Sequence, residues 1–202
     1  EITSGLETKT LGQQAYYLDS IDSTQNQALK MANDSKNNGA IIIAEKQTGG
    51  RGRSGRKWIS PKGGIWFSII LHPKFDIANT TLFPIASSLA LAYSIEKTCK
   101  ISAELKWPND VTLTGKKIAG ILIDTSIISN EIENMVLGIG INFKIKPHEL
   151  ANTIKKTPNF YGVTTLVKKN DNALPLVQQF LYELKNIFQL INSGHIKKIK
   201  NG

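Results

Sequence analysis

The chain contains little cysteine and little histidine, and each scarcity argues against a class of protein. Its 202 residues include a single cysteine, Cys99, so no internal disulfide can form, as is usual in a reducing compartment such as the cytoplasm. The three histidines lie far apart, without cysteine or acidic residues at ligand spacing, which argues against a protein-held zinc site. The apolar runs are short, and no signal peptide is visible. We therefore expect a cytoplasmic protein that does not enter a membrane.

Arginine occurs only in one glycine-rich segment, residues 47–58, at Arg51, Arg53 and Arg56. A planar guanidinium grips phosphate or carboxylate through two parallel hydrogen bonds, and interleaved glycines let backbone N–H groups approach an anion. The segment lies between two apolar runs that are typical of core strands, 40–44 and 65–71. It is not a Walker loop, because the Lys-Ser or Lys-Thr pair of that motif is missing. The pattern predicts an anion-binding loop, with a plain basic surface as the open alternative.

The net charge is +9, and the isoelectric point is about 9.6. Such a charge suits a nucleic acid, an anionic nucleotide or an acidic protein partner. A lysine-rich composition without any of these functions would give the same value. No segment offers a recognition helix with a turn before it, so we expect no sequence-specific DNA binding.

The apolar pattern alternates between strand-like and helix-like runs. Strands are expected at 14–18, 40–45, 64–71, 103–106, 111–113, 116–129 and 131–142. Helices are expected from a cap at residues 22–24 to about Met31, and over 82–100 and 173–192. Ser129-Asn130 predicts a tight hairpin between the two longest strands. Short links rather than repeated βαβ units predict an α/β (α+β) fold, with a mixed, largely antiparallel sheet and packed helices.

Five short segments combine polar residues with glycines or aromatic residues. They are 22–26, the arginine segment from Gln47, 106–110, 115–122 and 138–142. Each alone has an ordinary explanation, such as a helix cap, a basic loop, a turn or a closely packed strand. In this combination and order they resemble the biotin protein ligases, and the resemblance extends from about Leu18 to Asn142.

The resemblance implies a fold related to class II aminoacyl-tRNA synthetases and an ATP-dependent, AMP-forming ligation. In such enzymes the biotin carboxylate attacks the α-phosphorus of ATP, which gives biotinyl-5′-AMP and pyrophosphate. A lysine of the acceptor then displaces AMP. The implied substrates are ATP and biotin, with Mg²⁺. The implied acceptor is the biotin carboxyl carrier domain of acetyl-CoA carboxylase or a related carboxylase, and a homodimer is compatible with the resemblance.

The resemblance also assigns roles to residues of this chain. Catalysis would rest on Lys117, which would bridge the biotin carboxylate and the α-phosphate, and on Arg51 and Arg53. Biotin would contact Ser23, Thr24, Gln25, Gln47, Arg51, Gly52, Arg53, Trp58, Lys117 and Gly120. ATP would contact Gly50, Arg51, Arg53, Arg56, Lys106, Asn109, Asp110, Lys117 and Asn142, with Asp110 and Asn142 orienting Mg²⁺. Lys116 is expected to point to the opposite face of its strand and to be solvated.

The chain departs from the family pattern at both ends and at one internal position. No helix-turn-helix precedes Leu18 and no small C-terminal barrel follows, so we expect a catalytic domain over 1–193 and a frayed polar tail over 194–202. Val163 stands where some relatives stack tryptophan on adenine, with Phe160 and Tyr161 nearby. Two other functions remain open: a lipoate or octanoyl ligase or transferase of the same fold, and a basic nucleic-acid-binding module.

Overall fold

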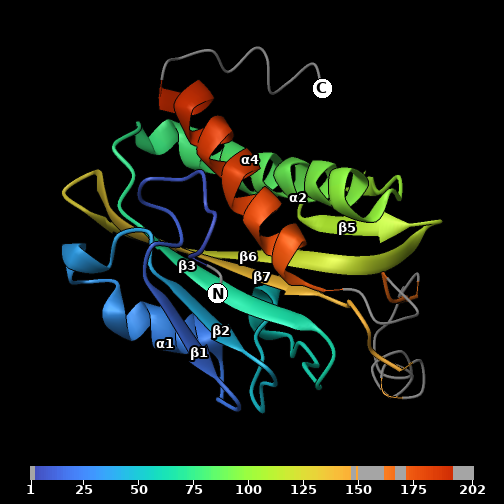
Figure 1. Cartoon of the computed structure of the whole chain (residues 1–202). Coiled ribbons are helices and arrows are strands. Elements are labelled where there is room, and N and C mark those ends of the chain that lie inside the picture. Colours follow the sequence, from blue (N-terminus) through green and yellow to red (C-terminus); the bar gives the residue numbers. More distant parts are fainter. Residues whose placement is uncertain (1–2, 147–148, 150–161, 167–171, 193–202) are drawn as a thin grey trace.

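The computed structural model describes residues 3–146, 149, 162–166 and 172–192. Its centre is one sheet of seven strands, in the order β1-β2-β3-β7-β6-β5-β4 (Figure 1). The strands are β1 (Ala15–Leu18), β2 (Ile41–Ala44), β3 (Ile65–Leu71), β4 (Glu104–Lys106), β5 (Asp110–Leu113), β6 (Lys116–Ile128) and β7 (Glu131–Ile141). Strands β1 and β2 are parallel, and every other neighbouring pair is antiparallel. The expected mixed, largely antiparallel sheet is therefore confirmed.

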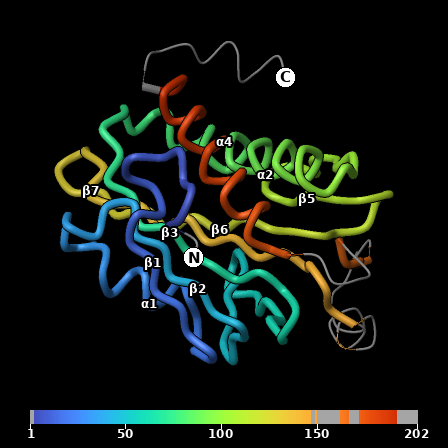
Figure 2. Tube along the Cα trace, in the orientation of Figure 1, coloured from blue at the N-terminus to red at the C-terminus, as the bar shows by residue number. Residues whose placement is uncertain are grey.

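The two longest strands, β6 and β7, form a hairpin across the middle of the sheet, and their path can be followed in Figure 2. Ser129 and Asn130 at its tip both have positive φ angles, 51° and 68°. Two such residues in a row form the type I′ turn, whose twist matches that of antiparallel strands. The hairpin expected at this dipeptide is thus confirmed, and it fixes which residues of β6 and β7 lie opposite one another.

Helices cover both faces of the sheet. Helix α1 (Thr24–Met31) lies on one face, and α2 (Phe83–Cys99) and α4 (Leu174–Asn192) cross each other on the other (Figure 1). Strand β2 serves both layers because its side chains alternate. Ile41 and Ile43 join the large core beneath α2 and α4, whereas Ile42 packs against α1. No helix within the described ranges is long and apolar enough to cross a membrane.

Helix α4 is an integral part of the large core. Phe180 is fully buried and meets Phe67 of β3 edge-on, with 5.8 Å between the ring centroids. The face expected to be apolar is the buried one, and Leu176 and Ile187 are buried as well. The tail expected over 194–202, together with Phe160 and Tyr161, lies outside the described residues.

Candidate active site

Three glycines clear a hollow on the sheet face that carries α1. Across the sheet, Gly140 of β7 lies between Trp66 and Gly120, and Gly138 lies between Ser68 and Leu122. The indole of Trp58 lies over this hollow. A Cβ atom at Gly140 would be 2.7 Å from Trp58 Nε1, and one at Gly120 would be 3.0 Å from the same ring. Trp58 Nε1 is buried without a hydrogen-bond partner in the described structure. Side chains at Gly120 and Gly140 would leave no room for the indole, and a Cβ atom at Gly138 would lie 2.3 Å from Gln25 Oε1.

The arginine loop, residues 48–57, belongs to the segment that connects β2 to β3, and it lies over the hollow. Gly52 N–H donates to the Arg56 carbonyl at 2.7 Å, and Trp58 N–H donates to the Gly50 carbonyl at 2.9 Å. Gly50 is required here, because a Cβ atom would lie 2.3 Å from the Trp58 carbonyl oxygen. A cavity of about 290 Å³ borders this loop, and its walls include Gln47, Gly50 and Trp58.

Two of the three arginines hold the loop against other elements. Arg53 Nη1 donates to Asn109 Oδ1 at 2.9 Å, and Arg51 Nη1 forms an ion pair with Asp124 of β6 at 3.2 Å. All three arginine side chains remain exposed. Asn109 in turn donates through Nδ2 to the Ile121 carbonyl at 2.6 Å, so this residue both satisfies backbone and receives an arginine.

Lys117 brings a positive charge to the edge of the hollow. Its Nζ is 2.6 Å from Asp110 Oδ1 and 4.8 Å from the centroid of the Trp58 ring. Burial lowers the pKa of Lys117 below its usual value of 10.5, the Asp110 carboxylate opposes this shift, and Arg56 and Arg53 add to it. Neighbouring Lys116 is exposed, as expected.

A β-bulge decides which way Lys117 points. Val111 of β5 pairs with Ala119, but Thr112 pairs with Lys117, so Ile118 is an extra residue in β6. Ile118 and Ala119 both face the core beneath α2 and α4. Lys117 consequently lies on the same face as Gly120, although strict alternation would place these two residues on opposite faces.

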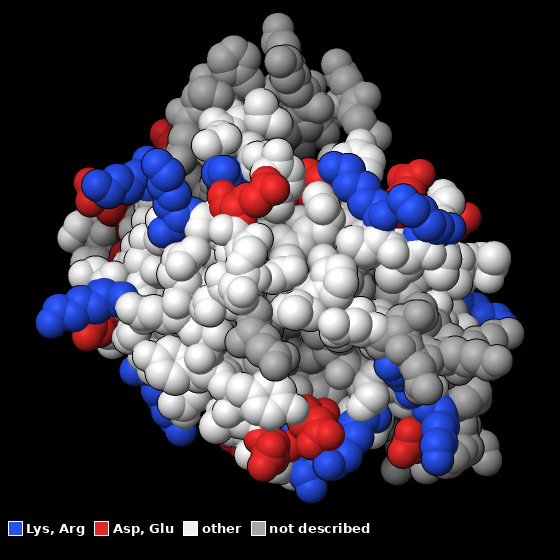
Figure 3. All heavy atoms as spheres, viewed as in Figure 1, with Lys and Arg blue, Asp and Glu red and all other residues white. Residues whose placement is uncertain are grey.

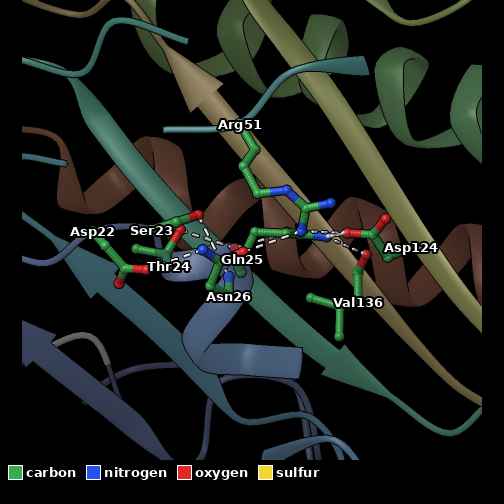
Figure 4. Close-up of polar contacts among 9 residues, drawn as sticks. Asp22, Ser23, Thr24, Gln25, Asn26, Arg51, Asp124 and Val136 are labelled. Atoms are coloured by element: carbon green, nitrogen blue, oxygen red, sulfur yellow. Dashed lines mark hydrogen bonds and ion pairs between the residues drawn. The ribbon is translucent and has the colours of Figure 1, made fainter. Parts of the chain in front are cut away.

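The opposite end of the hollow is lined by neutral polar groups. Ser23 caps α1 by accepting from the Asn26 N–H at 3.4 Å, as expected for a residue before a helix. Gln47 Oε1 accepts from the Thr24 N–H at 2.8 Å, and Gln47 Nε2 donates to Ser60 Oγ at 2.8 Å. Gln25 is buried and bonded through both ends of its amide (Figure 4). These amides and hydroxyls can recognise a small neutral head group.

The remaining predicted residues lie around the Lys117 end of the hollow. Lys106 is exposed on β4, opposite Asp110. Asn142 is buried just after β7, where its N–H donates to the Ile118 carbonyl at 2.7 Å. Val163 forms a backbone bridge with Lys117 and packs near Trp66. Within the described residues no group of three or more His, Cys, Asp or Glu side chains could hold a metal.

Sequence reasoning missed several residues of this network. Asp124 contacts both Arg51 and Gln25, Ser68 links Gln25 to Thr24, and Asn26 Oδ1 accepts from Arg51 at 3.2 Å. Asp124 and Ser68 do leave a signal, because each is a polar residue inside an apolar strand. Such residues need a partner when they are buried or half-buried.

Comparisons with known proteins identify the family of the chain. Residues 17–142 match the model of the biotin/lipoate A/B protein ligase family. The chain is 36% identical over 156 residues to the bifunctional ligase/repressor BirA of Bacillus subtilis, a match covering 77% of this chain and 48% of that protein. It is also 36% identical over 128 residues to the biotin–[acetyl-CoA-carboxylase] ligase of Paracoccus denitrificans, covering 62% and 53%.

A solved structure shows the same fold. The biotin protein ligase from Aquifex aeolicus in complex with biotin and ATP superposes with a TM-score of 0.70 and 30% identity, covering 89% of this chain and 72% of that one. The chain spans about half the length of the curated relatives described above. The match over residues 17–142 places this chain in the biotin/lipoate A/B protein ligase family.

Proposed function

We propose that the chain is a biotin–protein ligase that forms biotinyl-5′-AMP from biotin and ATP and transfers the biotinyl group to a lysine. The observation that carries this proposal is the position of Lys117. Its ammonium lies at the edge of a glycine-cleared hollow, beneath a loop that carries every arginine of the chain. Relatives that share this fold include an enzyme solved with biotin and ATP.

The first half-reaction joins two anions and therefore needs positive charge more than it needs acid–base groups. The biotin carboxylate attacks the α-phosphorus, and pyrophosphate leaves with the bonding electron pair. Lys117 neutralises the carboxylate and the α-phosphate together, while Arg51, Arg53 and Arg56 neutralise the phosphates and Gly52 lets the backbone close on them. Trp58 and Gly120 form the apolar wall for biotin. Exclusion of water by the closed loop would preserve the mixed anhydride.

The ureido head group of biotin is neutral and contains both N–H donors and a carbonyl acceptor. Ser23, Thr24 and Gln47 supply matching hydroxyls and an amide at the end of the hollow opposite Lys117, where α1 begins. Asp110 and Asn142 offer the carboxylate and amide oxygens that Mg²⁺ accepts beside substrate phosphates. When bound with ATP, that ion would supply charge stabilisation on the phosphates, and Lys106 would add a further cation.

The acceptor is proposed to be the biotin carboxyl carrier domain of a carboxylase, since a similar protein is named as an acetyl-CoA carboxylase ligase. In the second half-reaction the acceptor lysine attacks the acyl carbon of biotinyl-AMP and AMP leaves. This transfer requires a carrier surface to reach the arginine loop, most of whose residues, including all three arginines, are exposed.

Biotin-dependent exchange of labelled pyrophosphate into ATP tests the proposal directly. Exchange with biotin but not with lipoate supports it, whereas exchange with lipoate alone would assign the chain to the other branch of its family. Nucleic-acid binding is disfavoured on the face shown in Figure 3. On the described part of the face in Figure 3, lysines and arginines alternate with acidic residues rather than forming a basic stripe.

The alkaline limit of adenylation is expected to lie below the pH at which a free lysine loses its proton. Lys117 must be charged to act, and burial lowers its pKa from 10.5. Asp110 raises that pKa, so Asp110→Asn should lower it further and move the alkaline limb of the kcat/KM profile to lower pH. Glu104→Gln on the adjacent strand is the control. An unmoved limb in Asp110→Asn would contradict the assignment of this limb to Lys117.

Arg53→Gly is expected to leave adenylation partly working but to release biotinyl-AMP about ten to a hundred times faster. The guanidinium ties the loop to Asn109, and a hydrogen bond to a charged group is worth roughly 1.5–3 kcal/mol. Release is measured by indiscriminate biotin labelling of a bystander protein. Lys57→Gly in the same loop controls for added backbone freedom. Equal release by parent and Arg53→Gly would remove Arg53 from this role.

A further inference from the structure

Asp124 joins two parts of the site that are far apart in the sequence. Its Oδ2 atom accepts from Gln25 Nε2 of α1 at 3.0 Å and from Arg51 Nη1 of the arginine loop at 3.2 Å (Figure 4). Asp124 lies on β6 opposite Val136, on the sheet face that carries the hollow. Its side chain is 30% exposed, so the carboxylate is partly shielded from water.

The carboxylate and the Val136 carbonyl together set the orientation of the Gln25 amide. Gln25 Nε2 donates to Asp124 and also to the Val136 carbonyl at 3.0 Å. An ionised carboxylate and a carbonyl can only accept, so the NH₂ group must face them and the amide oxygen must face away. That oxygen accepts from Ser68 Oγ at 3.0 Å.

The orientation is passed on to Thr24. Ser68 uses its only proton on Gln25, so the 2.9 Å contact between Ser68 Oγ and Thr24 Oγ1 must use the Thr24 proton. Gln47 Oε1, which accepts from the Thr24 N–H at 2.8 Å, has a second lone pair and lies 3.1 Å from the same hydroxyl, so it shares the Thr24 proton with Ser68. Thr24 Oγ1 is therefore left with a lone pair to offer a ligand, which suits an N–H donor.

We propose that Asp124 is a positioning residue that fixes the donor and acceptor pattern of the head-group pocket and anchors Arg51 above it. The proposal rests on biotin as the ligand for its effect on affinity, but not for the orientation of Gln25. A carboxamide at position 124 can donate as well as accept. Asp124→Asn would leave the Val136 carbonyl as the one partner that must accept from Gln25 Nε2, loosen the Gln25 amide and the Ser68–Thr24 hydrogen bond that depends on it, and weaken the hold on Arg51.

Steady-state adenylation separates this role from catalysis. Asp124→Asn is expected to raise the KM for biotin about ten- to a hundredfold with little change in kcat, because hydrogen bonds that position the bound ligand are lost before chemistry begins. Glu133→Gln removes one acidic charge from the same hairpin, at an exposed residue that pairs with Ser126 instead, and should leave the KM unchanged. A KM for Asp124→Asn within twofold of the parent would overturn the positioning role.

A spectroscopic measurement without ligand tests the orientation itself. The two side-chain NH₂ protons of Gln25 should exchange slowly with solvent in the parent, because both are hydrogen-bonded. Their ¹H–¹⁵N signals are identified by their loss in Gln25→Met. In Asp124→Asn this protection should fall, while Glu133→Gln should match the parent. Retained protection in Asp124→Asn would refute the argument even if biotin proved not to be the ligand. Failure of the parent to bind biotin would instead refute the proposed function.

Discussion

Lys117→Ala is expected to lower biotin-dependent pyrophosphate exchange by at least about 10²–10³-fold, because removal of a single preorganised neutral donor already has an effect of that size. Lys117 is the lysine whose ammonium lies beside Asp110 and over Trp58, at the point where the two reacting anions would meet. The substitution should leave the fold intact, since the aliphatic part of the side chain lies at the rim of the hollow rather than in the large core.

Two companion variants make this result specific. Lys116→Ala removes the same charge one residue away from an exposed position, and its rate should stay close to that of the parent. Lys117→Arg retains the charge but spreads it over a planar fork, so it should restore little activity. Equal losses in Lys116→Ala and Lys117→Ala would mean that general basicity, rather than one placed charge, supports the reaction.

Phe180→Ala is expected to destabilise the protein by about 3–5 kcal/mol, because it removes a fully buried aromatic ring from between α4 and the sheet. Domains of this kind are usually stable by only about 5–15 kcal/mol, so the variant should lose a large part of its stability. Urea unfolding followed by circular dichroism measures the change.

The control for this variant lies on the same helix. Gln189 is exposed, so Gln189→Ala removes surface atoms without opening a cavity and should change stability by less than about 0.5 kcal/mol. If Phe180→Ala were as mild as Gln189→Ala, α4 would be a loosely attached helix rather than part of the core.

Most of the fold could be predicted from local patterns. The caps at residues 22–24, the Ser129-Asn130 turn and the apolar faces of α2 and α4 place nearly every element within a few residues of its observed bounds. These features are local, because capping and turn formation depend on residues close together in the chain. The order of the strands across the sheet depends on contacts between segments that are distant in the sequence, such as the pairing of β3 with β7. Only the structure shows this order.

The candidate site was predictable as a set of residues but not as a network. The segments containing Thr24, Gln47, Arg51 and Lys117 all stood out, and the structure brings them around one hollow. Asp124 is visible in the sequence only as a polar residue in a long strand, which does not identify its partners. Its role depends on contacts 73 and 99 residues away in the sequence.

The sequence by itself determined the elements, the family and the chemistry available, because these follow from residue types and their spacing. The tertiary structure decided which of these side chains meet. Simple alternation along β6 would have sent Lys117 away from Gly120, and the bulge at Ile118 returns it to the face of the hollow. A bulge depends on pairing with a partner strand, so its effect on a single lysine could not be read from the strand alone.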